Sequence, residues 1–435
     1  YFVDTYKKYL IEELNREFKE AGILEYIDFD SIEDEIELLD TIEIDLTQFK
    51  KYIKSKKVEE IWKNSMDQAL RNTKVWVKKE LFLCLMSLEH NDTAIGSNNY
   101  AISIGTNSST IGRMLNQIIL EIYKKESFRK VYLIFKVKEG INYKTGPLTD
   151  LLEQVIECIH ENKNIRLSFL DATFNQTESG CEVEYLPSGK RILDNINPDK
   201  RVSKGRILLA TTSINLVRIA LATKEKEAFY TELAVAIEHT KNELLQAFES
   251  VASKYKDDFK YLFQENIFLD SEKLDTNGKI RKILRSGTLD INITGLYEAS
   301  LYLEKEASSS LALEILTFIR KKADEISQNE RLNFVVSETL NEKVRSYFLA
   351  IDKSIYGSIP GVTDKERYDT FSDAFLADQD HRLERTGEYQ KLTNGGHLLK
   401  IKLAKNVSLK KIQEIIQDAH QNDIGYLDMK VRDGT

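Results

Sequence analysis

A short loop rich in small residues carries one of the three cysteines of this 435-residue chain. Gly180 directly precedes Cys181, and Gly189 follows in the same stretch. Because glycine adopts backbone conformations that other residues avoid, this pattern predicts a tight loop with close backbone approach. A thiol on such a loop could take part in catalysis, but a free cysteine is also often an ordinary core residue. Both interpretations of Cys181 stay open at this level, whereas Cys84 and Cys158 lie in apolar helical patterns and are predicted to be core residues.

A second group of polar and glycine residues could bind a ligand. Asn215 follows a β-rich run and precedes an apolar helix, so its side chain could hydrogen-bond a substrate or cap that helix. Gly395 and Gly396 could let the backbone approach a ligand, and they also fit a turn before a strand. His397 follows this pair and is interpreted as a structural residue rather than a general base.

Thr339 and Glu342 stand where a helix is expected to begin. The first N–H groups of a helix have no partner within it, so a helix N-terminus can bind an anion such as a phosphate. The same Thr-x-x-Glu spacing is that of a capping box, which is the simpler explanation.

The elements that must position these residues alternate between strands and helices. Strands are predicted at residues 100–104, 131–138, 166–170, 206–212, 287–295, 331–336 and 397–403. Helices are predicted at residues 1–20, 59–90, 109–125, 148–161, 213–254, 296–328, 339–348 and 409–422. Ser109 is the candidate N-cap of the third of these helices, and Asp30 and Asp45 are candidate starts of two further helices. This alternation indicates a parallel α/β arrangement.

Composition narrows the classes of protein and partner. Hydrophobic residues make up 42% and charged residues 30% of the chain, which is typical of a globular protein. A net charge of -8 does not favour nucleic acid as a partner. Three widely spaced cysteines are no disulfide framework and fit a reducing, cytoplasmic compartment. No apolar run approaches the roughly 20 residues of a membrane span, so no membrane partner is expected.

Several segments, taken in order, resemble the anaerobic (class III) ribonucleoside-triphosphate reductases, a family of glycyl radical enzymes. The Gly180-Cys181 loop is similar to the finger loop of that family, and Ile214-Asn215-Leu216-Val217-Arg218 is similar to its Ile-Asn-Leu-Pro-Arg segment. The resemblance is collinear from about residue 1 to about residue 430. Further similar segments are residues 135–143, 169–175, 287–299, 352–364 and 392–397.

The resemblance implies a ten-stranded α/β radical barrel, made of two parallel half-barrels, with an N-terminal helical extension. Residues 1–128 would form the helical N-terminal part, and residues 129–435 the barrel core around the cysteine loop. Cys181 would form a thiyl radical that takes the ribose 3′ hydrogen of a ribonucleoside triphosphate. The implied substrate-binding residues are Asn215, Thr339, Glu342, Gly395 and Gly396.

The resemblance also implies partners and cofactors. Asn99 and Arg113 would bind a nucleotide effector, with a polar surface loop as the alternative. The implied cofactors are a glycyl radical and a zinc ion in a C-terminal segment. The implied reductant is formate, or a thiol system as in some members, and the implied partner is a radical S-adenosylmethionine activating enzyme. A homodimer is expected, and no metal ligand is expected within these 435 residues.

The sequence departs from the family pattern at several points. Val217 stands where the family has proline, Thr339-Leu-Asn-Glu342 replaces Thr-Pro-Ala-Glu, and Tyr368-Asp-Thr-Phe371 replaces Tyr-Thr-Asn-Ser. The Arg-Val-Cys-Gly-Tyr glycyl motif and the paired Cys-x-x-Cys motifs do not occur in the 435 residues, and the nucleotide-binding cone is expected before residue 1.

Two hypotheses follow from the resemblance and the departures. The chain is either the central part of a reductase or a catalytically inactive homologue that binds nucleotide or regulates a partner. By themselves, the 435 residues are expected not to reduce ribonucleotides, because they contain no motif that would make the radical.

Overall fold

The fold is described from a computed structural model of the whole chain. The residues that it describes are 2–20, 56–93, 96–97, 99–259, 262–263, 266–275, 277–306, 308–374 and 382–431. Two predicted helix starts, at Asp30 and Asp45, lie outside these residues. Within the described part of the chain, no helix is long and apolar enough to cross a membrane.

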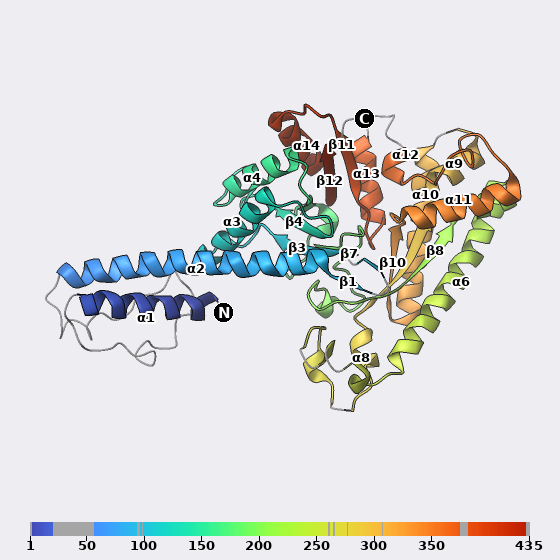
Figure 1. Cartoon of the computed structure of the whole chain (residues 1–435). Helices are drawn as coiled ribbons and strands as arrows, with labels where there is room; N and C mark the ends of the chain where they lie inside the picture. The colour runs from blue at the N-terminus through green and yellow to red at the C-terminus, as the bar shows by residue number, and fades with distance from the viewer. Residues whose placement is uncertain are drawn as a thin grey trace.

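Two helices at the N-terminus lie side by side and project from the rest of the molecule (Figure 1). They are α1 (Phe2–Glu20) and α2 (Lys56–His90), close to the predicted bounds. Apolar residues at helical spacing on α1 face α2, which is the arrangement expected of two amphipathic helices. The buried residues of this contact are Tyr6, Leu10, Leu14, Phe18, Ile61 and Ala69.

A five-stranded sheet forms the middle of the molecule. Its order is β11 (Leu399–Leu403), β12 (Tyr426–Val431), β5 (Ile165–Phe169), β4 (Val131–Val137) and β3 (Tyr100–Ile104). Neighbouring strands are parallel except β12 and β5, which are antiparallel. The main covering helices are α3 (Thr110–Lys125), α4 (Thr149–His160) and α14 (Leu409–Gln421), whose apolar sides share one core with the sheet.

A second, parallel sheet has the order β10 (Asn333–Glu338), β9 (Thr288–Thr294) and β8 (Leu208–Asn215). Its own apolar core lies between the strands and the surrounding helices. These helices are α5 (Leu216–Thr223), α6 (Lys226–Ala252), α8 (Arg281–Leu284), α9 (Leu296–Glu304), α10 (Ser309–Glu330) and α13 (Arg382–Leu392). Two further helices, α11 (Glu342–Tyr356) and α12 (Phe371–Ala374), follow β10 along the chain.

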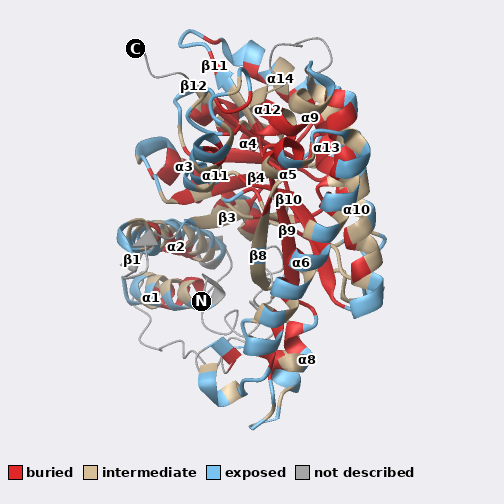
Figure 2. Ribbon diagram, turned by 90° about the vertical axis from the view of Figure 1, so that its right-hand side faces the viewer, coloured by how far each residue is buried: buried red, intermediate tan, exposed pale blue. Residues whose placement is uncertain are grey.

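The strands alternate between an apolar outer face and a more polar inner face. In β9, Leu289, Ile291 and Ile293 point into the helix-covered core, while Asp290 and Asn292 point the other way. Side chains of a strand point to opposite faces in turn, so the run Thr-Leu-Asp-Ile-Asn-Ile-Thr divides between the two sides. Figure 2 shows buried residues gathered along the inner strands of both sheets, while the edge strands β8 and β3 are mostly of intermediate burial.

The two sheets meet at one edge and enclose a hairpin. A parallel bridge joins Ser337 of β10 to Gly396, just before β11, so that eight strands follow in the order β8 to β3. The hairpin of β6 (Glu184–Tyr185) and β7 (Arg191–Ile192) lies between the sheets. A separate small hairpin pairs β1 (Asp92–Thr93) with β2 (Gly96–Ser97).

Most predicted elements are confirmed, with several differences. Helices α8, α12 and α13 were not predicted, and the predicted helices 213–254 and 296–328 are each divided in two. The helix predicted from residue 213 begins only at Leu216, because Asn215 ends β8 and caps α5. Strand β12 and the hairpin β6–β7 were not predicted. The prediction of parallel strands is correct for β8–β9–β10, for β11–β12 and for β3–β4–β5. The pair β12–β5 is antiparallel.

Candidate active site

The loop that carries Cys181 is held by the five-stranded sheet through two carboxylates. Lys136 of β4 contacts Glu182 at 2.9 Å and Glu184 at 2.5 Å. Ser103 of β3 donates to Glu184 at 2.6 Å, and Thr106 donates to Glu182 at 3.1 Å. The contacts begin at the residue after Cys181, so β3 and β4 position the cysteine directly.

Cys181 itself is half-buried and packs against an apolar cluster inside the two sheets. Its Sγ lies 3.8 Å from Oγ of Ser203 and 3.7 Å from the carbonyl oxygen of Glu182. Arg206 lies close enough to interact electrostatically with the thiol. Burial lowers the pKa of the Arg206 guanidinium to about 10. The thiol is therefore shielded from bulk water but is not sealed in a core.

The other two cysteines differ from each other. Cys158 is fully buried in the core of the five-stranded sheet, as predicted, and burial raises the pKa of its thiol to about 11. The prediction that Cys84 is a core residue was wrong, because its side of α2 faces solvent. The apolar pattern around Cys84 was misleading, because only one face of this long helix packs against the core.

A row of short polar side chains covers the inner face of the three-stranded sheet. Asp290 accepts hydrogen bonds from Ser337 at 2.6 Å and from Thr211 at 3.2 Å. Asn292 donates to Ser337 at 2.8 Å and accepts from Thr339. We call Thr211, Asp290, Asn292, Ser337, Thr339 and Thr294 the polar row.

Thr339 is a buried member of the polar row rather than a helix cap. Its hydroxyl lies 2.7 Å from that of Thr294. The cap of α11 is Asn341, whose side chain accepts from the N–H of Lys343, so the predicted capping box does not form. Glu342 begins α11 and is exposed, with arginine nitrogens of Arg345 and Arg367 no nearer than 3.8 Å.

Asn215 caps α5 by accepting from the N–H of Arg218 at 3.1 Å. Its amide also donates to Asp352 at 2.7 Å. Asp352 is fully buried and accepts further from Arg218 and from the hydroxyl of Tyr368 at 2.6 Å. Asn215 therefore caps the helix, as one of its two interpretations predicted. A substrate that bonds to its amide would have to share the amide with Asp352.

Gly395 and Gly396 bring the backbone close to the hairpin rather than to open space. A side chain at Gly396, which has a φ of 112°, would meet the carbonyl oxygen of Gly189 at 2.1 Å. The N–H of Gly395 donates to Val336 at 2.8 Å, and its carbonyl accepts from Arg191 at 2.9 Å. This glycine pair joins β10 to the hairpin.

His397 belongs to a buried group that sequence reasoning did not assemble. Its Nδ1 lies 2.7 Å from a carboxylate oxygen of Glu338, and its Nε2 lies 2.6 Å from Oγ of Ser372. The N–H of Phe371 donates to the other oxygen of Glu338 at 2.6 Å. All these residues are buried, which agrees with a structural role for His397.

The two predicted effector residues lie at opposite ends of β3. Asn99 is exposed just before the strand. Arg113 lies in the first turn of α3, where it donates to the carbonyl of Pro147 at 2.6 Å and pairs with Asp150 at 2.7 Å. The structure thus does not bring these two residues together. Ser109 caps α3 as predicted.

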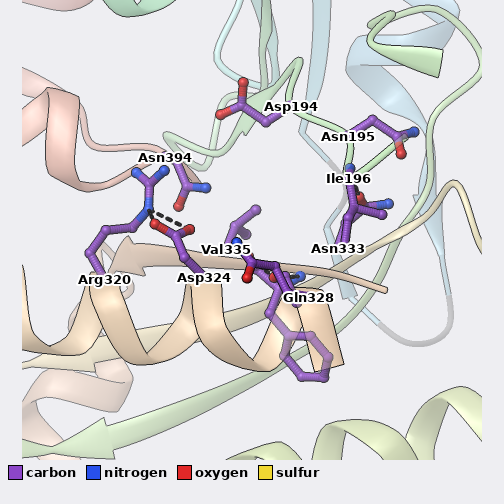
Figure 3. A pocket seen from close by; sticks show the side chains of 11 residues that line it. Asp194, Asn195, Ile196, Arg320, Asp324, Gln328, Asn333, Val335 and Asn394 are labelled. Carbon is purple, nitrogen blue, oxygen red and sulfur yellow. Dashed lines mark hydrogen bonds and ion pairs between the residues drawn. The ribbon is translucent and has the colours of Figure 1, made fainter. Parts of the chain in front are cut away.

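A polar pocket of about 340 Å³ lies beside the segment that follows the hairpin (Figure 3). Asp194 and Asn394 line it, together with Arg320 and Asp324 of α10, whose side chains are 2.9 Å apart. The amide of Asn394 accepts from the N–H of Val336 at 2.9 Å, where a neighbouring strand would otherwise bond. The pocket thus marks the place where β10 and β11 separate.

A sequence model of the family described as anaerobic ribonucleoside-triphosphate reductase matches residues 89–432. The chain belongs to this family. The reductase of Enterobacteria phage T4 is 22% identical over 385 residues, which cover 82% of this chain and 62% of that protein. The Escherichia coli K12 reductase is 23% identical over 380 residues, which cover 80% of this chain and 52% of that protein. The chain therefore spans about half to three fifths of these relatives.

Solved reductases share the fold. One anaerobic ribonucleotide reductase matches with a TM-score of 0.61 at 14% identity, covering 83% of this chain and 58% of that protein. The enzyme from Thermotoga maritima in complex with dATP and CTP matches with a TM-score of 0.57 at 13% identity, covering 82% and 61%. The α/β arrangement with a helical N-terminus is therefore that of the anaerobic reductases.

The residues of this chain do not fit a reductase zinc site. Such a site takes four ligands, and two Cys-x-x-Cys pairs would supply them. The chain has three cysteines at wide spacing. Among the described residues, no group of three or more histidine, cysteine or acidic side chains is placed to hold a metal ion.

Proposed function

We propose that this chain forms the thiol-bearing barrel of an anaerobic ribonucleotide reductase, with Cys181 as the residue that takes the ribose 3′ hydrogen. The observation that carries the proposal is the position of the Cys181 loop, which is held between two sheets that meet at the single bridge between Ser337 and Gly396. Residues 129–435 make up most of this barrel, and β3 and α3 contribute from before residue 129.

The chemistry assigned to this chain is positioning and shielding. A glycyl radical, which family membership implies and these 435 residues do not contain, would take the hydrogen atom of the Cys181 thiol and leave a thiyl radical there. Catalysis then needs the sulfur and the ribose in near contact, about 3–3.5 Å apart. The apolar cluster around half-buried Cys181 partly shields the thiol from water, and the polar row offers hydroxyl and amide groups for a ribose or phosphate.

The proposed ligands are ribonucleoside triphosphates. Thr339 in the polar row and Asn215 at the end of β8 are the proposed contacts, because Asn215 pairs in register with Thr294, which bonds to Thr339. The nucleotide complex of the Thermotoga maritima relative supports this ligand class. A nucleotide effector, an activating enzyme, formate and a homodimer are further proposals that rest on family membership.

One observation favours a second function, that of a nucleotide-binding homologue without radical chemistry. The groups proposed to bind substrate are already bonded to each other: Asn215 to Asp352, and Thr339 to Asn292. A substrate must compete with these contacts, and an unmade buried hydrogen bond costs about 1–3 kcal/mol.

The test uses the thiol as a reporter. Bound ribonucleoside triphosphate is expected to slow alkylation of Cys181 by N-ethylmaleimide, while exposed Cys84 reacts unchanged in the same sample. Equal reaction rates of Cys181 with and without millimolar nucleotide would argue against both functions.

A turnover assay separates the two functions. The protein is incubated anaerobically with a radical S-adenosylmethionine activating enzyme, S-adenosylmethionine, formate and a ribonucleoside triphosphate. Deoxynucleotide that disappears in Cys181→Ala supports the reductase. Because the 435 residues contain no glycyl motif, the same assay is repeated with a glycyl-radical segment from a relative added. Protection of Cys181 without product in both assays supports the nucleotide-binding homologue.

A further inference from the structure

The turn of the β6–β7 hairpin sends one charged side chain into the three-stranded sheet. Nζ of Lys190 forms an ion pair with the carboxylate of Asp290 and lies 2.5 Å from Oγ of Ser337. The Asp290 side chain is 0% exposed and that of Lys190 is 11% exposed. Such a pair is strongly coupled, because removing one partner leaves an uncompensated buried charge.

The same loop is fixed on its other side near the cysteine. Glu182, directly after Cys181, pairs with Lys136 of β4, and Glu184 pairs with the same lysine. The loop thus spans the space between the sheets, with one set of ionic contacts on each side. Cys181 directly precedes the first of these contacts, so the depth at which the hairpin lies between the sheets also sets the position of the thiol.

Lys190 is not needed to form the hairpin itself. Arg191, the next residue, bonds to Asn175 at 2.9 Å, to Asp194 at 2.8 Å and to the carbonyl of Asn394 at 3.3 Å. The side chain of Lys190 instead joins the polar row, in which Asp290 leads through Ser337 and Asn292 to Thr339.

We infer that Lys190 is a positioning residue: through Asp290 it holds the Cys181 loop at a fixed depth against the polar row. The inference rests on the proposed function, in which the distance between the thiol and a ligand on this row decides reactivity. Lys190 acts on Cys181 through the loop and touches no reacting atom.

The experiment measures alkylation of individual cysteines by N-ethylmaleimide, followed by mass spectrometry of the peptides. Lys190→Met keeps the length of the side chain and removes its charge. Modification of Cys181 is expected to speed up by about tenfold or more, because the loop opens locally when its buried ion pair is lost. Fully buried Cys158 is expected to react at its original slow rate.

Lys200→Met is the matched control. Lys200 lies on the same connecting segment and pairs with Asp270 at 2.5 Å, away from the polar row. Its loss is expected to leave the Cys181 rate unchanged. An unchanged Cys181 rate in folded Lys190→Met would overturn the inference. So would an equal rise at Cys158, which reports global loosening, or an equal effect of Lys200→Met.

If Lys190→Met does not fold, Ser337→Ala replaces it. This variant keeps both charges and removes the hydroxyl that bonds to Lys190, Asp290 and Asn292, so a rise of about fivefold at Cys181 is expected. No rise in this variant would overturn the inference. Labelling needs no nucleotide and no radical, so its outcome stands apart from that of the turnover assay.

Discussion

The inner faces of the two sheets are built from different chemistry. On the five-stranded sheet, Ile134, Leu398 and Tyr426 form an apolar surface against the hairpin, with the Arg166–Asp428 pair beside it at 3.1 Å. On the three-stranded sheet, the polar row bonds within itself and to Lys190. The first face thus combines an apolar patch with ionic contacts from Lys136 to the hairpin, whereas the second face is hydrogen-bonded throughout.

This difference indicates that the two faces have separate roles. A packing surface holds its partner wherever the shapes fit, while a hydrogen-bonding surface demands defined partners, because each buried polar group must be satisfied. The apolar patch of the first face, together with Lys136, seats the Cys181 loop, and the second face offers the groups proposed to bind a ligand. The following changes would break or sharpen this comparison.

The largest effect on stability is expected from Tyr426→Ala in the apolar patch of the five-stranded sheet. Tyr426 is fully buried and stacks on Tyr185 with ring centres 4.3 Å apart. Loss of the ring is expected to lower the free energy of unfolding by about 3–5 kcal/mol, measured by urea denaturation. Tyr426→Phe is the control and should cost under about 1 kcal/mol, because the hydroxyl contacts to Arg166 and Leu186 are long, at 3.5 and 3.4 Å. Equal losses in both variants would show that this face depends on hydrogen bonds.

In the polar row, Thr339→Val keeps the shape of the side chain and removes its hydroxyl. Thr294 and Asn292 lose a partner in a buried place, so the expected destabilisation is about 1–3 kcal/mol. Thr339→Ser keeps the hydrogen bonds and should retain more of the stability. A smaller loss for Thr339→Val than for Thr339→Ser would assign this face to packing as well.

The helix-covered side of the three-stranded sheet contains a carboxyl group that should make stability depend on pH. Burial raises the pKa of Glu298 to about 7, although Lys365 at 2.9 Å and the N–H of Asp369 at 2.7 Å counteract the shift. The folded protein therefore binds this proton more tightly than the unfolded chain does. Its contribution to stability is fully present below the ordinary pKa of 4.5 and is lost as the pH rises through about 7.

Glu298→Gln tests this expectation, because glutamine does not titrate. Relative to the variant, the wild-type protein should lose about 1–3 kcal/mol of unfolding free energy between pH 5 and pH 8. Urea denaturation at several pH values measures the difference. A gap between the two proteins that stays constant with pH would contradict the prediction.

The smallest effects are expected where α11 begins, beyond the end of the polar row. Asn341→Ala removes the cap that accepts from Lys343 at 3.0 Å and should cost about 1 kcal/mol. Glu342→Ala should change stability by less than about 0.5 kcal/mol, because this residue is exposed. Thermal unfolding of the two variants measures both effects. A larger loss of stability for Glu342→Ala than for Asn341→Ala would support the capping box that the sequence suggested.

The caps show where local sequence was sufficient and where it was not. Ser109 was predicted to cap α3 and does so, because an N-cap involves only residues within one turn. At α11 the same reasoning chose Thr339, whose hydroxyl bonds instead to Asn292 and Thr294 on a neighbouring strand. A partner from another strand competes with the local cap, and local spacing contains no information about that partner.

The sequence by itself determined the family, the loop with Gly180 and Cys181, and most strands and helices, because alternation and local turn chemistry are written in neighbouring residues. Only the tertiary structure decided which of its polar residues meet. Lys190 reaches Asp290, and Arg166 reaches Asp428, across long stretches of chain. Buried charges need partners, but the chain order does not say which; the packing of two sheets around one hairpin does.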